Sequence, residues 1–142
     1  MRILPLFVLL AACGGDNTAP FIGVWKNTSG SSTTTCPGMA AQTAAIPANA
    51  FSMTVSKNGN NALLLAGTDP SGGTCNYTAS AVSNTTASLT PGIQCPIGAG
   101  TLTVVSGNFV VGAGVTAELS MSATEASGGT SCDATFDLQL IQ

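Results

Sequence analysis

The stretch Cys132-Asp133-Ala134-Thr135-Phe136-Asp137-Leu138-Gln139-Leu140 decides the fold class of this chain. Small or apolar side chains occupy every second position, and polar side chains fill the positions between them. Because successive side chains of a β-strand point to opposite faces, this alternation predicts a strand with one face in a core and the other in solvent. It is the most regular alternation in the 142 residues.

The same period of two extends toward the N-terminus. Asn58-Gly59 predicts a tight hairpin turn, and Gly, Ser, Asn and Pro mark the other turns. A total of eight or nine short strands, with turn signals about every 8–12 residues, predicts an all-β fold. We expect an antiparallel meander of about eight strands closed as a small barrel, since closure removes exposed sheet edges. A β-sandwich is the alternative. The further strands are expected at residues 51–56, 62–66, 75–81, 85–89, 101–106, 109–111 and 115–122.

Two segments are expected to interrupt the strands. Residues 29–50 contain Gly, Ser and Thr runs typical of a loop, with one or two helical turns over residues 39–45, ended by Pro47. The second is Ser106-Gly107-Asn108, which predicts a turn between two strands.

Four cysteines follow the N-terminal region, and an even number in an exported chain predicts two disulfides. Three pairings are possible. We favour Cys75–Cys95, which flanks a local hairpin, and Cys36–Cys132, which would join the segment after the first strand to the start of the last. A zinc site is the alternative, but the chain has no Cys-x-x-Cys pair and no His. We therefore expect no metal and no cofactor.

The N-terminus combines Met1-Arg2, an apolar segment over residues 3–12, and Leu10-Ala11-Ala12-Cys13. This order resembles the signal segment of bacterial lipoproteins, and a simple secretory signal is the alternative. The resemblance implies cleavage before Cys13 and a diacylglycerol on its sulfur, which would attach the protein to a membrane of the cell envelope. Gly14 in place of the Asp that commonly retains such proteins favours the outer membrane. We expect a signal peptide over residues 1–12, a lipid-anchored tether over 13–20 and an all-β domain over 21–142.

Composition excludes several function classes. Residues 13–142 hold two lysines and six carboxylates, a net charge of −4, so they lack the basic footprint that nucleic acids require. Without His, no Ser-His-Asp or Cys-His arrangement exists. Asp133 and Asp137 would lie about 13 Å apart on one strand face, farther apart than the carboxylates of glycosidases. We expect no catalytic residues, and we interpret the sequon Asn27-Thr28-Ser29 as turn and strand polarity.

Phe21-Ile22-Gly23-Val24-Trp25 opens the predicted domain. Gly-x-Trp on a first strand resembles the lipocalins and related calycins. The resemblance implies an eight-stranded barrel in which Trp25 plugs one end and the interior binds a small apolar ligand. The Arg that lipocalins usually pack over this Trp is missing from residues 13–142. In the alternative interpretation, Trp25 is simply the largest anchor of the core.

Two function hypotheses follow. The first is a lipid-anchored envelope protein that acts as a non-enzymatic structural or interaction module, with an envelope protein as its partner. The alternative is a lipocalin-like carrier of a small apolar ligand. A solid core would favour the first, and a pocket lined by Val, Leu, Phe and Tyr would favour the second. The sequence does not identify the ligand-binding residues or the oligomeric state.

Overall fold

The computed structural model describes residues 15–68 and 73–142. Cys13 and the predicted signal peptide lie outside the described residues. The short 3₁₀ helix η1 (Ala19–Phe21) precedes the first strand, and no helix in the described part of the chain is long and apolar enough to cross a membrane. The strands are β1 (Gly23–Thr35), β2 (Gln42–Ile46), β3 (Ser52–Lys57), β4 (Ala62–Thr68), β5 (Thr74–Ala81), β6 (Thr86–Leu89), β7 (Gln94–Ile97), β8 (Gly100–Val111), β9 (Thr116–Ser127) and β10 (Thr130–Ile141).

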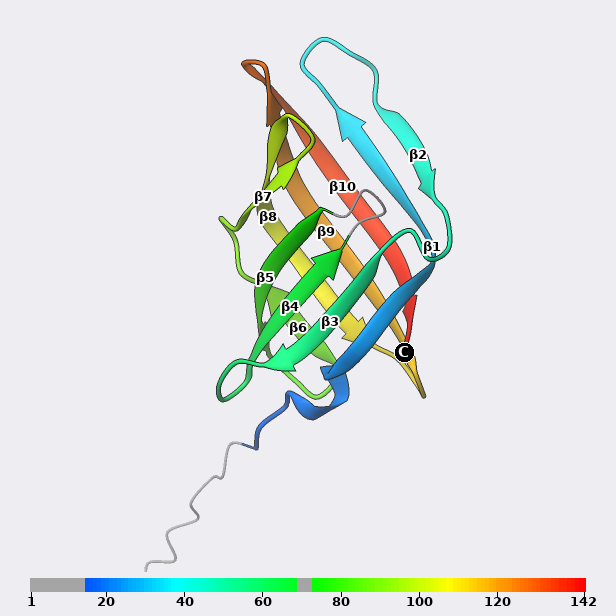
Figure 1. Ribbon diagram of the computed structural model, residues 1–142, viewed down its shortest axis with the longest axis vertical. Helices are drawn as coiled ribbons and strands as arrows, with labels where there is room; N and C mark the ends of the chain where they lie inside the picture. The colour runs from blue at the N-terminus through cyan, green and yellow to red at the C-terminus, as the bar shows by residue number, and fades with distance from the viewer. Residues whose placement is uncertain (1–14, 69–72) are drawn as a thin grey trace, which may run out of the picture.

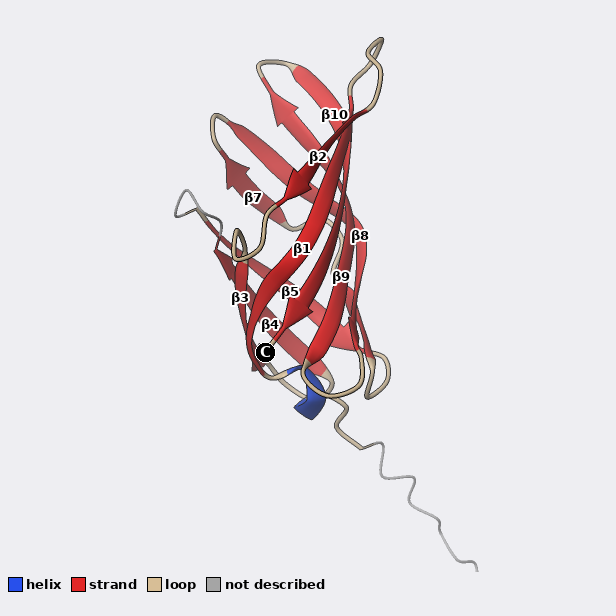
Figure 2. Ribbon diagram, turned by 90° about the vertical axis from the view of Figure 1, so that its right-hand side faces the viewer, coloured by secondary structure: helices blue, strands red, loops and turns tan. Residues whose placement is uncertain are grey.

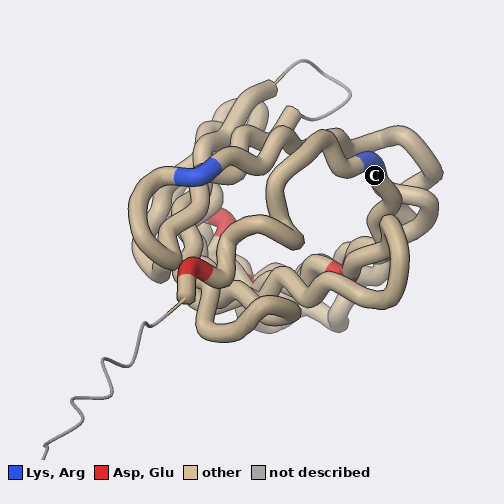
Figure 3. The backbone as a smooth tube through the Cα atoms, turned by 90° about the horizontal axis from the view of Figure 1, so that it is seen from below, with Lys and Arg blue, Asp and Glu red and all other residues tan. Residues whose placement is uncertain are grey.

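Eight of these strands close into an antiparallel barrel in the order β1-β3-β4-β5-β6-β8-β9-β10 (Figures 1 and 2). Pairing of β10 with β1, from Lys26–Ile141 to Thr35–Asp133, completes the ring. The two extra strands pair outside this ring order, β2 with β1 and β7 with β8. Seen from below, the barrel wall forms a ring with few charged residues (Figure 3). The predicted closed barrel is confirmed, and the β-sandwich alternative is wrong.

The loop and helical turns predicted for residues 29–50 are wrong. β1 continues to Thr35, and β2 occupies residues 42–46. The upper part of β1 pairs with β10 from Ser29 to Thr35 and with β2 from Gly30 to Thr34, so backbone hydrogen bonds on both sides hold this part of the strand without a buried apolar face. The Thr33 and Thr43 hydroxyls lie 2.8 Å apart across β1 and β2, and β-branched Thr favours extended backbone.

The turn predicted at residues 106–108 is also wrong, because β8 runs unbroken through it. A register shift between Val104 and Ser106 accommodates one extra residue opposite β9. Gly107 serves close packing here: a Cβ at this position would lie 2.6 Å from Leu89 Cδ1 and 2.8 Å from the Ser120 carbonyl oxygen. A glycine inside a strand can mark a bulge or the close approach of a neighbour instead of a turn.

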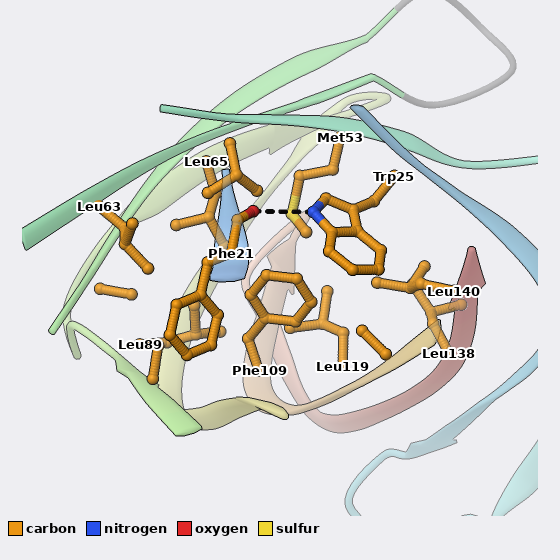
Figure 4. Packing of buried hydrophobic residues seen from close by; sticks show 14 of the residues in the cluster. Phe21, Trp25, Met53, Leu63, Leu65, Leu89, Phe109, Leu119, Leu138 and Leu140 are labelled. Carbon is orange, nitrogen blue, oxygen red and sulfur yellow. Dashed lines mark hydrogen bonds between the residues drawn. The ribbon is translucent and has the colours of Figure 1, made fainter. Parts of the chain in front are cut away.

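One end of the barrel, called the closed end below, is filled by aromatic rings next to η1 (Figure 4). The rings of Trp25 and Phe109 meet edge to face with centroids 5.4 Å apart, and Phe21 packs against Phe109 at 5.5 Å. The indole Nε1 of Trp25 donates a hydrogen bond of 2.8 Å to the Phe21 carbonyl oxygen. This bond satisfies the polar atom of a side chain that is only 1% exposed.

The segment before η1 is attached to the same end. Asp16 forms an ion pair with Lys57 and accepts a hydrogen bond of 3.1 Å from the Thr18 backbone N–H. The Asn17 N–H donates to the Asn61 side-chain oxygen at 2.8 Å. Hydrogen bonding from Lys57 and then from Thr18 lowers the pKa of Asp16 to about 2. The residues that lead into the barrel therefore contact the β3–β4 turn at the closed end.

Both predicted disulfides are confirmed. Cys36–Cys132 joins the residue after β1 to the start of β10, and Cys75–Cys95 joins β5 to β7. The zinc alternative is wrong because all four thiols are used in these bonds. Both disulfides lie toward the other end of the barrel, called the open end below. They tie together strands at the end of the barrel opposite the plug of Phe21, Trp25 and Phe109.

Candidate cavity at the open end

A cavity of about 480 Å³ lies above the aromatic plug, between the middle of the barrel and the open end. This volume is in the range of pockets that hold small organic ligands. Its lining is predominantly apolar and draws on most strands of the barrel. The lining residues are Ser32, Ala45, Ile46, Pro47, Ala50, Phe51, Met53, Leu65, Tyr77, Leu89, Ile97, Leu102, Leu119, Met121, Glu125, Phe136 and Leu138.

The cavity exists because the inward side chains are buried at its floor and only partly buried above the floor. Leu119 and Leu138 are buried and face each other across β9 and β10, where they form part of the floor. One inward position higher, Met121 lies opposite Phe136, and both are only partly buried. Among the described residues, no side chain fills this level as Trp25 fills the closed end, so Met121 and Phe136 border open space.

The strand that pairs with β1 on the side away from β10 also changes at this level. The lower part of β1 pairs with β3, whereas the upper part pairs with β2. The connection from β2 to β3, residues 47–51, then crosses beside the interior and adds Pro47, Ala50 and Phe51 to the cavity lining. The cavity is therefore bounded partly by the barrel strands and partly by this connection.

Asn27 holds the connection in place. Its side chain donates a hydrogen bond of 2.7 Å to the Pro47 carbonyl oxygen and accepts one of 2.8 Å from the Phe51 N–H. Its backbone carbonyl accepts a third, also of 2.8 Å, from the Asn49 N–H. Asn27 is 1% exposed, so its interpretation as turn and strand polarity misses its role. A single Asn near the start of a strand gives no sequence signal that its side chain holds a connection about 20 residues away.

Glu125 is the one charged residue among the described residues that line the cavity. It lies on β9 between Leu102 of β8 and Cys132 of β10, directly in register with both. Glu125 lies outside the strand predicted from the sequence, which ends at residue 122. The signal was present: Glu125 continues the inward series of Ala117, Leu119 and Met121 at a period of two.

The other carboxylates singled out in the sequence do not form a site. Asp133 and Asp137 are exposed on the outer face of β10, where Asp137 lies opposite Ser120. Glu118 is exposed as well and lies opposite Gln139. Within residues 15–68 and 73–142, no three His, Cys, Asp or Glu side chains gather closely enough to hold a metal ion.

Comparison of the chain with protein-family models and with curated proteins finds no match.

Proposed function

We propose that this protein binds a small apolar ligand in the barrel cavity and acts as a carrier, in the manner of a lipocalin. The single observation that supports the proposal most is the apolar cavity of about 480 Å³. A structural module needs no such space, and interiors without a ligand are usually packed to high density. The aromatic residues Phe51, Tyr77 and Phe136 in the lining offer broad contact surfaces for an apolar guest.

The two ends of the barrel support the same proposal. The plug of Phe21, Trp25 and Phe109 closes one end and stabilises the fold independently of a ligand. The cavity can then remain unfilled at the other end without loss of the core. The position of Trp25 in the plug also agrees with the Gly-x-Trp resemblance to lipocalins, because a barrel needs one plugged end to form a cup.

Binding of N-phenyl-1-naphthylamine, a neutral fluorescent probe, tests the proposal. The chain from Gly15 onward contains every described strand and both disulfides, and it is exported to an oxidising periplasm for purification. We expect saturable enhancement of probe fluorescence. Met121→Trp, which adds bulk at the cavity lining, should weaken binding about tenfold or more, because the larger side chain occupies part of the space that the probe fills. Val110→Trp, on the outer face of β8, is the matched control.

Fluorescence that does not saturate, or equal binding by the two tryptophan variants when both are folded by circular dichroism, would contradict the carrier proposal. Native mass spectrometry of the protein purified from its own cells provides an independent check. A specific added mass on the folded chain would start the identification of the ligand.

We also propose that the carrier is a lipoprotein of the cell envelope, attached through Cys13. The sequence Leu10-Ala11-Ala12-Cys13, which resembles the cleavage site of bacterial lipoproteins, supports this attachment. Cys13 is two residues from Gly15, a separation of at most about 7 Å in an extended chain, and Asp16 contacts the closed end. The acyl chains would thus leave the protein near its closed end, and the open end would face away from the membrane.

Metabolic labelling with an alkyne analogue of palmitate tests the anchor. We expect the wild-type chain to incorporate the label and to sediment with membranes, and Cys13→Ser to do neither. Gly15→Ser is a suitable control, since nothing lies within 4 Å of a Cβ at this position. Equal labelling of the wild-type chain and Cys13→Ser would rule out acylation at this thiol.

A further inference from the structure

Among the described residues that line the cavity, Glu125 alone is charged, and its chemistry narrows the class of ligand that the cavity can bind. Glu125 lines the cavity near the open end, half-buried beside the buried Leu102. The ion pair present in the described part of the chain joins Lys57 to Asp16 and does not involve Glu125. Within the same residues, no hydrogen bond to the Glu125 carboxylate is found. This carboxylate is therefore available to a ligand.

The position of Glu125 relative to the cavity floor sets the shape of that ligand. Leu119, Met121 and Glu125 lie on the inner face of β9 and all line the cavity. The path along the strand from Leu119 to Glu125 covers six residues, about 20 Å. A molecule that fills this path meets apolar side chains at its inner end and a carboxylate at its outer end. The lining thus suits an elongated apolar body with one polar head.

The charges around the open end determine the sign of the head. Both lysines of the described chain lie toward the closed end: Lys26 pairs with Ile141, and Lys57 precedes the β3–β4 turn. No cation in the described residues is therefore placed to neutralise an anionic head beside Glu125. An anion there would meet a like charge in partly apolar surroundings, which is unfavourable. A cation would form a charge-assisted hydrogen bond with the carboxylate.

We propose that the cavity selects amphiphiles with an apolar body and a protonated amine head, and that Glu125 binds the amine. This inference rests on the proposed carrier function. The apolar lining supplies affinity through burial of the body. Glu125 supplies selectivity, because it favours a cationic head over a neutral one and disfavours an anionic one.

Displacement of N-phenyl-1-naphthylamine by three probes of equal chain length tests the inference. The probes are decylamine, decanol and decanoate at pH 7 and physiological ionic strength, below their aggregation thresholds. We expect decylamine to bind about tenfold or more tightly than decanol, as a hydrogen bond to a charged group predicts, and decanoate to bind most weakly. Glu125→Gln should reduce the preference for decylamine over decanol to within about twofold.

Glu118→Gln is the matched control, since Glu118 lies on the outer face of the same strand and its loss changes net charge equally. It should preserve the preference for decylamine. Glu125→Lys provides a second variant, in which decanoate should bind more tightly than decylamine. Equal binding of decylamine and decanol by the wild-type chain, or an unchanged preference in Glu125→Gln, would overturn this inference but leave the carrier proposal intact. Failure of all three probes and of the fluorophore to bind would overturn both.

Discussion

Removal of the Cys36–Cys132 disulfide by Cys36→Ala/Cys132→Ala is expected to lower the free energy of unfolding by nearly 5 kcal/mol, about the largest loss that loop closure predicts. The two cysteines are 96 residues apart, so their bond restricts most of the unfolded chain. In the folded chain it joins β1 to β10, the pair that closes the ring. Urea unfolding of the wild-type and double-variant chains measures the difference.

The Cys75–Cys95 disulfide provides the matched comparison. Its cysteines are 20 residues apart, and the same entropy relation predicts a smaller loss of about 3 kcal/mol for Cys75→Ala/Cys95→Ala. The two double variants remove equal numbers of sulfur atoms and differ in the length of the loop that is released. A loss for Cys75→Ala/Cys95→Ala equal to or larger than that for Cys36→Ala/Cys132→Ala would contradict the loop-length explanation.

The strands that could be predicted from the sequence are those whose stability depends on an apolar face. In β10 the residues at alternate positions from Ala134 to Leu140 are buried or half-buried, as the pattern predicts. The upper part of β1 and all of β2 escaped prediction because no residue there is fully buried. Strand pairing, more than burial, holds them. The upper part of β1 pairs with β10, about a hundred residues away, which no local sequence pattern reports, and β2 pairs in turn with β1.

The cavity, too, could not be predicted in detail from local sequence patterns. The Gly-x-Trp resemblance predicts an interior that holds a ligand, but it does not predict which residues line the interior. Met121 and Phe136 lie opposite each other on β9 and β10 and both line the cavity, which the alternation of either strand alone does not predict. Glu125 occupies an inward-facing position of its strand, but only the folded structure shows that it lies at a cavity. Asn27 acts through residues 20 and 24 positions away.

Trp25→Ala is expected to lower the free energy of unfolding by about 3–5 kcal/mol, the usual cost of truncating a large buried aromatic side chain. Trp25 is 1% exposed and contacts Phe109 edge to face, so alanine would leave a void in the plug that closes the barrel. Val24→Ala is the control on the same strand, because the Val24 side chain points outward and is 52% exposed. We expect it to cost less than about 1 kcal/mol.

Trp25→Phe separates the ring from its hydrogen bond. It keeps an aromatic side chain in the plug but removes the donor to the Phe21 carbonyl oxygen, so we expect a loss of about 1–3 kcal/mol. Because the plug and the cavity occupy different levels of the barrel, folded Trp25→Phe should bind N-phenyl-1-naphthylamine as the wild-type chain does. Urea unfolding and probe titration measure the two effects on one sample. If Trp25→Ala cost no more than Val24→Ala, Trp25 would not anchor the closed end. If Trp25→Phe weakened probe binding, the plug and the cavity would not be independent.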